Sequence, residues 1–261
     1  MQNYQSEIGN TRYKNNKYVN SEDKNCENRN SKDKDCKYRK TDFHTHSRAS
    51  GHGTEDSITD MAREAARRSM ETLGISDHGP ASPGSAGLSY FRSLILCERS
   101  RFGVRLCYGA EANILDKDGS LDIPDEVLKS LDYCIISMHR PIYTPGSEAE
   151  NTRAYIRAMR HPGVKIIGHC DDSRFPVNYR ELAEAALAAD VIPEINNVSL
   201  LPGSYRKNCR ENTLRLLNAC QLLSCPVLLS SDSHGCEHIG EVTEALRLLQ
   251  EAGFPRQLLL N

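Results

Sequence analysis

Short apolar runs alternate with longer stretches of helical spacing from about residue 39 to the end of the chain. The apolar runs predict strands near 40–44, 73–76, 104–110, 133–137, 164–167, 191–195, 226–230 and 257–260. The intervening stretches predict a helix after Ser57 and further helices near 88–101, 125–131, 148–160, 179–189, 209–223 and 239–252. This alternation is typical of a parallel sheet whose strands are joined by crossover helices.

The first helix carries the clearest local signal. Ile58, Met61, Ala62 and Ala65 follow helical spacing. Ser57 precedes them and Asp60 follows three residues later, which predicts a capping box. About seven or eight strand–helix units close most economically as a barrel. An open doubly wound sheet is the alternative, but it would gather ligands at one switch point.

The N-terminal segment differs from the rest of the chain. Residues 1–38 contain eight Asn and no repeating apolar period, which predicts a disordered polar and basic tail before a domain at 39–261. Residues 1–40 hold ten Lys/Arg and six Asp/Glu, so with a net charge of −2 the remainder carries −6. This mildly acidic body does not favour long nucleic acid as a partner.

The sequence shows no membrane span, no secretory signal and no cysteine spacing typical of a metal-binding finger. There is no stretch of about 18 apolar residues, so no membrane span is predicted. The first residues lack the apolar core of a secretory signal. The ten cysteines show no CxxC or Cys/His finger spacing, and several lie in apolar segments. We therefore expect reduced thiols and a cytoplasmic protein.

Histidines and acids follow the apolar runs with unusual regularity. The positions that share this placement, or lie close to one of these runs, are His44, His46, His52, His78, Glu111, His139, His169, Asp232 and His234. Side chains at the carboxyl ends of successive parallel strands meet at one mouth of a barrel. Imidazoles and carboxylates gathered there are metal ligands.

The spacing of two pairs strengthens this interpretation. His44-x-His46 and Asp232-x-His234 each direct two side chains to one face of a strand. Nine ligands exceed the need of one tetrahedral zinc, so the set suits two or three metals with a bridging carboxylate. The two remaining histidines, His161 and His238, are interpreted as structural.

The motifs around these residues resemble the PHP (polymerase and histidinol phosphatase) superfamily. The matching segments, in chain order, are Asp42-Phe43-His44-Thr45-His46-Ser47, His52, Ile75-Ser76-Asp77-His78-Gly79-Pro80, Gly109-Ala110-Glu111-Ala112-Asn113-Ile114, Ser137-Met138-His139, Gly168-His169, Glu194-Ile195-Asn196-Asn197 and Ser231-Asp232-Ser233-His234. They cover about residues 40–261. The chain looks most similar to the YcdX-like stand-alone phosphatases of that superfamily.

The resemblance implies an α/β fold, a distorted (β/α)7 TIM-like barrel, holding three divalent metal ions. Zinc is the usual metal, with manganese or iron in relatives. By resemblance, the first metal takes His44, His46, Glu111 and Asp232. The second shares Glu111 and adds His139 and His169. The third takes His52, His78 and His234.

Three departures from the family pattern bear on function and stability. Cys170 stands where proline is expected, and residues 171–176 form an unfamiliar loop. Because such loops select substrates, specificity cannot be transferred from relatives. The sequence stops at Asn261, within the predicted last strand. Relatives continue into a final helix, so we expect apolar barrel surface to be exposed there.

The predicted reaction is hydrolysis of a small phosphomonoester by metal-activated water, without a phosphoenzyme. A bound metal lowers the pKa of water toward about 7, so a serine or cysteine nucleophile is unnecessary. Arg140, Arg174 and Arg210 are candidate contacts for the substrate phosphate. The alternatives are a nuclease or nucleotide phosphohydrolase, an amidohydrolase, and a metal-binding protein without catalysis. The sequence indicates no oligomeric state.

Overall fold

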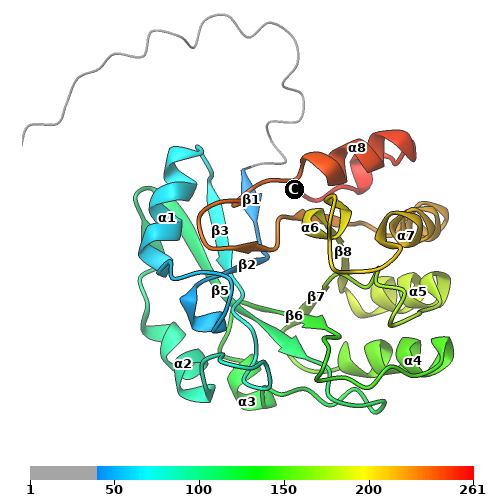
Figure 1. Ribbon diagram of the computed structural model, residues 1–261, viewed down its shortest axis with the longest axis horizontal. Helices are drawn as coiled ribbons and strands as arrows, with labels where there is room; N and C mark the ends of the chain where they lie inside the picture. The colour runs from blue at the N-terminus through cyan, green and yellow to red at the C-terminus, as the bar shows by residue number, and fades with distance from the viewer. Residues whose placement is uncertain (1–39) are drawn as a thin grey trace, which may run out of the picture. The chain divides into compact units, whose positions relative to one another are not determined.

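Parallel strands form a nearly closed barrel with helices outside it in the computed structural model, which describes residues 40–261 (Figure 1). The strands are β1 (Thr41–Asp42), β2 (Thr45–His46), β3 (Thr72–Ile75), β4 (Ser100–Arg101), β5 (Val104–Asn113), β6 (Tyr133–Ser137), β7 (Val164–Ile167), β8 (Ile192–Asn196), β9 (Leu228–Ser230) and β10 (Ser233–His234). The main sheet runs β1-β3-β5-β6-β7-β8-β9, with every neighbour parallel. The predicted tail at 1–38 lies outside the described residues.

The end of the chain pairs with its beginning and nearly completes the circle. β10 runs parallel to β2, with His234 opposite His46 and Ser233 opposite Thr45. The backbone amide of Ser231 also donates to the Asp42 carboxylate at 3.3 Å. This arrangement confirms the barrel and rules out the open sheet, whose outer strands would stay apart.

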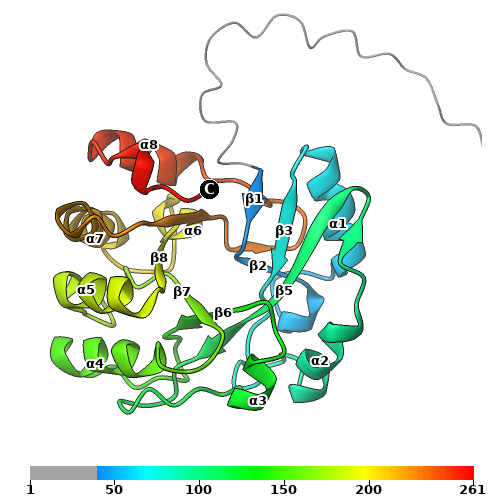
Figure 2. The same ribbon diagram turned by 180° about the vertical axis from the view of Figure 1, so that it is seen from behind.

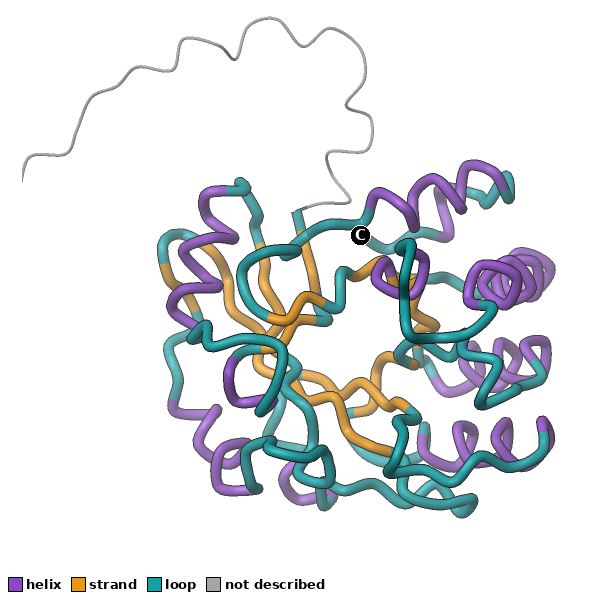
Figure 3. Tube along the Cα trace, in the orientation of Figure 1, coloured by secondary structure: helices purple, strands orange, loops and turns teal. Residues whose placement is uncertain are grey.

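The helices lie around the strands, as the view from behind also shows (Figure 2; purple in Figure 3). They are α1 (Ile58–Arg67), α2 (Leu88–Ser93), α3 (Asp125–Leu128), α4 (Glu148–Ala158), α5 (Tyr179–Ala189), α6 (Asn197–Leu200), α7 (Cys209–Leu223) and α8 (Thr243–Glu251), with 3-10 turns at Arg48–Ser50, Leu94–Leu96 and Arg256–Leu258. None of the helices between residues 40 and 261 has both the length and the apolarity needed to cross a membrane.

The predicted capping box of α1 is confirmed. Ser57 Oγ accepts from the Asp60 amide at 3.3 Å, and Asp60 Oδ2 accepts from the Ser57 amide at 3.1 Å. Two amides left open at the helix start are thereby satisfied, which stabilises such an end by about 1 kcal/mol. Met61, Ala62 and Ala65 are buried on the inner side of this helix, as their spacing predicts.

The prediction of one helix over 88–101 is wrong. The α-helix stops at Ser93, a 3-10 turn follows, and Ser100–Arg101 pairs antiparallel with the start of β5. Phe102 and Gly103, with φ of 53° and 81°, form the tight turn between these strands. Two successive residues with positive φ suit a two-residue hairpin and are incompatible with a continuing helix.

The predicted strand near 257–260 is also wrong in its extent. Arg256–Leu258 forms a 3-10 turn after Pro255, and a single parallel bridge joins Leu259 to Val227. The Leu260 amide donates to the Val227 carbonyl at 3.2 Å and the Val227 amide donates to the Leu258 carbonyl at 2.9 Å, so the segment adds a single bridge and no full strand to the barrel.

The interior of the barrel is divided into an apolar half and a polar half. Tyr133, at the start of β6, packs in a buried apolar cluster with Cys107, Ile135, Ile166 and Leu228. Its hydroxyl donates to the Phe43 carbonyl at 2.7 Å. A Cβ at Gly109 would lie 2.6 Å from the Tyr133 ring, so glycine is required beside it. This apolar cluster lines a hollow at the amino-terminal end of the barrel, whereas buried polar side chains gather at the carboxyl ends of the strands.

Candidate metal centre

Side chains from most of the parallel strands meet at the carboxyl end of the barrel. Eight of the nine predicted metal ligands converge there: His44, His46, His78, Glu111, His139, His169, Asp232 and His234. They lie in or directly after β2, β3, β5, β6, β7, β9 and β10, or between β1 and β2. The barrel therefore brings together residues that are as much as 190 positions apart in the sequence.

Glu111 lies at the centre of this cluster and is fully buried. Its Oε1 lies 2.8 Å from His169 Nε2, 3.3 Å from His139 Nε2 and 3.4 Å from His44 Nε2. Its Oε2 lies 3.6 Å from His46 Nε2. The two oxygens thus face different sets of imidazoles, which is the arrangement of a carboxylate that bridges two cations.

Asp232 supplies the second acid of the cluster. Its Oδ1 lies 3.2 Å from His46 Nε2 and 3.6 Å from His44 Nε2. Asp232 has a φ of 56°, in the left-handed region that aspartate tolerates better than most residues. This backbone conformation turns the chain between β9 and β10 and presents the carboxylate to the two histidines.

The ligand atoms fall into overlapping groups. Atoms within 4.8 Å of one another are contributed by His44–Glu111–His169, His44–His46–Asp232, His78–Glu111–His139 and His46–His78–His234. His52 is in none of these groups. Its exposed imidazole instead stacks on His78, with ring centroids 4.9 Å apart, at the edge of the cluster.

The donor atoms fit divalent cations. Among residues 40–261, eight buried side-chain N or O atoms lack a hydrogen-bond partner, and five of them belong to this cluster. They are His44 Nε2, His46 Nε2, His78 Nδ1, Glu111 Oε2 and His234 Nε2. His78 Nδ1 and Glu111 Oε2 approach to 2.6 Å without hydrogen-bond geometry. Buried polar atoms are normally satisfied, so their convergence indicates a shared cation.

Protonation states also suit metal binding. Burial lowers the pKa of His46 and of His234, and lowers that of His139 to about 4. Burial alone would raise the pKa of Glu111, but neighbouring imidazoles, His139 first among them, hold it well below its usual value. His46, His139 and His234 therefore offer neutral imidazoles, and Glu111 offers an ionised carboxylate, the forms that coordinate metals.

A buried carboxylate outside the predicted ligand set positions two of the histidines. Glu194, on β8, accepts from His44 Nδ1 at 2.6 Å and from the His169 amide at 2.7 Å. A carboxylate on the second ring nitrogen fixes the tautomer and orientation of a ligating histidine. In the sequence, Glu194 belongs to a motif of the resemblance but is not among the predicted ligands. An acidic residue within a buried strand is the signal that could have identified it.

A similar link holds His46. Ser50 Oγ lies 3.0 Å from His46 Nδ1 and donates to Asp77 at 2.8 Å. Asp77 also accepts from the Ser47 amide at 2.7 Å and from the Ser47 hydroxyl at 2.8 Å. The acid beside His78 therefore orients a different histidine, through one intervening serine.

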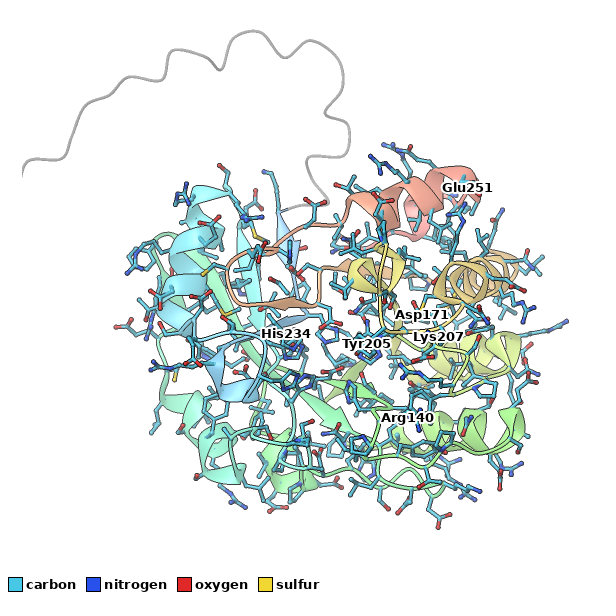
Figure 4. The ribbon with its side chains drawn as sticks, viewed as in Figure 1. Arg140, Asp171, Tyr205, Lys207, His234 and Glu251 are labelled. Carbon is cyan, nitrogen blue, oxygen red and sulfur yellow. The ribbon has the colours of Figure 1, made fainter. Side chains whose placement is uncertain are left out.

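The three predicted phosphate-contacting arginines lie in different surroundings. Arg140 and Arg174 line recesses beside the cluster. Arg210 lies on α7 and pairs with Glu251 of α8, where both side chains are more than half exposed. Figure 4 labels Glu251 on α8, away from His234. The structure thus does not bring Arg210 to the site, because α7 directs it outward toward α8.

Arg206 is a site residue that the sequence did not reveal. It is 7% exposed, and its Nη2 donates to Asp232 Oδ2 at 2.8 Å. Its Nη1 donates to Asn196 Oδ1 at 3.2 Å and to Ser199 Oγ at 3.0 Å. It lines the recess of about 450 Å³ into which His52, His78, His139 and His234 also face. A buried guanidinium beside a ligand carboxylate suits recognition of an anion.

The residues set aside as structural occupy other places. His161 pairs with Asp125 at 2.6 Å, and His238 is half exposed near Glu237. Cys170 is buried, and burial raises the pKa of its thiol. It is therefore a neutral core side chain that packs beside the cluster.

Comparisons with known proteins agree with this geometry. The family model described as the PHP domain matches residues 42–200. A probable phosphatase of Clostridium botulinum strain Hall is 39% identical over 220 residues, which cover 84% of this chain and 89% of that protein. A probable phosphatase of Thermoanaerobacter sp. strain X514 is 36% identical over 221 residues, with the same coverage of both chains.

Among solved structures, the fold is similar to histidinol phosphate phosphatase from Lactococcus lactis. The TM-score is 0.58 at 19% sequence identity, and the match covers 83% of this chain and 95% of that one. The Lactococcus protein was solved with zinc, L-histidinol and phosphate. At this identity the likeness shows a shared fold.

Proposed function

Because the chain belongs to the PHP domain family, we propose that it is a metal-dependent phosphatase that hydrolyses small phosphate monoesters at the strand-end cluster. The relatives named probable phosphatase cover most of both chains and support this assignment. The observation that carries the proposal is Glu111, a buried carboxylate whose two oxygens face different imidazoles. The cluster offers ligands for cations, and the recess beside it is lined by Arg140 and Arg206, which can bind an anion.

We assign three divalent metal ions to the cluster, most naturally Zn²⁺, with Mn²⁺ or Fe²⁺ as alternatives. Imidazole nitrogen and carboxylate oxygen suit all three metals. The first ion would take His44, His46, Glu111 and Asp232, the second Glu111, His139 and His169, and the third His52, His78 and His234. His44, His46 and Asp232 of the first set form one close group of ligand atoms. In the second set, His139 Nε2 and His169 Nε2 lie 3.3 Å and 2.8 Å from Glu111 Oε1. The third needs His52 to turn inward from its exposed position.

Bound divalent cations lower the pKa of water and neutralise phosphate charge, which are the two demands of phosphoester hydrolysis. The chain's own residues do the rest. Arg206 holds the outer oxygen of Asp232 and lines the recess, so it would orient Asp232 and face the substrate phosphate. The Cys170 thiol is buried and neutral, so it does not offer a competing nucleophile. Water would therefore attack the substrate phosphate directly, and no covalent phosphoenzyme would form.

The decisive experiment measures metal content and hydrolysis on one purified sample of the full chain. We expect close to three equivalents of divalent metal and release of phosphate from p-nitrophenyl phosphate. We expect a cyclic amide to remain uncleaved, and a labelled oligonucleotide to remain intact in low and high salt. Cleavage of the amide alone would identify an amidohydrolase. Metal without any turnover would identify a binding protein.

Metal affinity is expected to rise with pH above about 6.5. Burial alone would lower the pKa of His44, but neighbouring carboxylates, Glu194 first among them, hold it well above its usual value of 6.5. A metal must displace this proton, so affinity should increase about tenfold per pH unit until His44 titrates. A titration with Zn²⁺ against a chromophoric chelator at several pH values measures the slope. An affinity that falls or stays level with rising pH would contradict the expectation.

A further inference from the structure

Two adjoining recesses open beside the metal ligands. The larger, of about 450 Å³, contains His52, His78 and His234, and the smaller, of about 130 Å³, contains His169 and Arg174. They share four lining residues, which are His139, Arg140, Tyr205 and Arg206. A ligand bound at the metal ligands in the larger recess can therefore extend into the smaller one.

The two recesses together carry an excess of positive charge, with three arginines and two acids in their lining. The only acids that line either recess, within the described residues, are Asp172 and Asp232. Each already has an arginine: Arg174 Nε donates to Asp172 Oδ2 at 2.8 Å, and Arg206 Nη2 donates to Asp232 Oδ2 at 2.8 Å. A cationic group entering here would find no unpaired carboxylate.

Arg140 supplies positive charge that no carboxylate within residues 40–261 neutralises. Its side chain is exposed, lines both recesses and has no ion pair among residues 40–261. Lys207 is exposed beyond Arg206, and Figure 4 labels it with Tyr205 and Arg140 on one side of His234. The excess positive charge thus lies on the side of the site away from His234.

Tyr205 organises the arginines around the smaller recess. Its ring is 60% exposed and lies 5.5 Å from the Arg174 guanidinium carbon and 5.1 Å from that of Arg206. Such cation–π contacts hold guanidinium groups in place at the surface. Because Asp172 also holds Arg174, the recess is preorganised before any ligand binds.

We propose that the phosphate ester hydrolysed at this site carries a second anionic group, a carboxylate or a phosphate, on its leaving group. Arg140 and Arg174 bind that group in the smaller recess, while the scissile phosphate faces the metal ligands of the larger one. This inference rests on the proposed phosphatase function. It assigns Arg140 and Arg174 to substrate selection, separate from the residues that hold metal.

The test compares esters that differ only in the charge of the leaving group. 3-Phosphoglycerate and glycerol 3-phosphate form one pair, in which a carboxylate replaces a hydroxymethyl group. Fructose 1,6-bisphosphate and fructose 6-phosphate form the second, which tests a second phosphate. O-phosphoethanolamine supplies a cationic leaving group. We expect kcat/KM to be on the order of tenfold higher for the anionic member of at least one pair, because charge-assisted hydrogen bonds are the strong ones. Which pair responds distinguishes carboxylate from phosphate.

Charge reversal makes the assignment specific. Arg140→Glu should invert the ratio of kcat/KM between 3-phosphoglycerate or fructose 1,6-bisphosphate and O-phosphoethanolamine. Arg174→Gln should reduce the preference for the anionic ester, chiefly through KM. The matched control is Arg210→Gln, which removes an exposed arginine of the α7–α8 surface and should leave the ratio as in the parent protein. Thermal unfolding of each variant establishes that it is folded.

The outcomes separate this inference from the function on which it rests. Hydrolysis of p-nitrophenyl phosphate with equal kcat/KM for the charged and neutral esters would overturn the second-anion site and leave the phosphatase intact. A preference for O-phosphoethanolamine would do the same. Failure to hydrolyse any phosphate ester would overturn both proposals.

Discussion

Glu111→Gln is expected to lower phosphatase activity by roughly a thousandfold, since metal ions contribute several kcal/mol of charge stabilisation to such reactions. The substitution keeps the shape of the side chain but removes the negative charge that five imidazoles surround. An amide also offers one oxygen where the carboxylate offers two. We therefore expect the loss of at least one equivalent of bound metal, measured by elemental analysis of the purified variant.

A surface substitution of the same chemistry provides the control. Glu126→Gln removes an exposed carboxylate whose contact is with Arg92 at 3.4 Å. Its activity and metal content should match those of the parent protein. A folded Glu111→Gln protein that retained both full turnover and full metal content would show that the cluster is not the catalytic centre.

Glu194→Gln is expected to reduce metal affinity and activity by about 10- to 100-fold, the usual cost of losing a partner of a ligating histidine. Both carboxylate oxygens are engaged as acceptors: Oε1 by His44 Nδ1 and Oε2 by the His169 amide. The amide of glutamine must turn an NH₂ group toward one of these donors. Either the His44 ring loses the bond that orients it, or the His169 backbone loses its anchor, although no ligand has been removed.

Zinc titration and steady-state kinetics measured on the same preparation test this role. The carboxylate of Glu184 is the matched control, because it is half exposed and pairs only with Arg180, at 3.0 Å, among the described residues. Glu184→Gln should change neither quantity. If Glu194→Gln bound zinc as tightly as the parent protein, Glu194 would have a role in packing alone.

The sequence predicted the fold and most of the cluster because both depend on local periodicity. An apolar run followed by His or an acid specifies a parallel strand and a residue at its carboxyl end. Strands near 133–137 and 164–167 and helices near 179–189 and 209–223 have the predicted bounds. His52 is the exception among the predicted ligands, since it lies on a loop whose direction no periodicity determines.

The residues that the sequence did not identify act through contacts between distant segments. Arg206 is one of many arginines, and only its contacts with Asn196, Ser199 and Asp232 reveal its place at the site. Glu194 lies within a strand like other buried residues, and its partners His44 and His169 are 150 and 25 positions away. The hairpin at Phe102–Gly103 was not predicted because the apolar run at 94–96 also fits the spacing of a continuing helix.

The parallel pairing of β2 with β10 has a consequence for synthesis of the protein. His46 emerges early from the ribosome, whereas its partner His234 follows 188 residues later. A nascent chain that has not yet reached Ser233 holds histidines from the first strands but not the segment that completes the ring. Since long-range contacts form only after both segments exist, the ring of strands can be completed only after translation has passed His234.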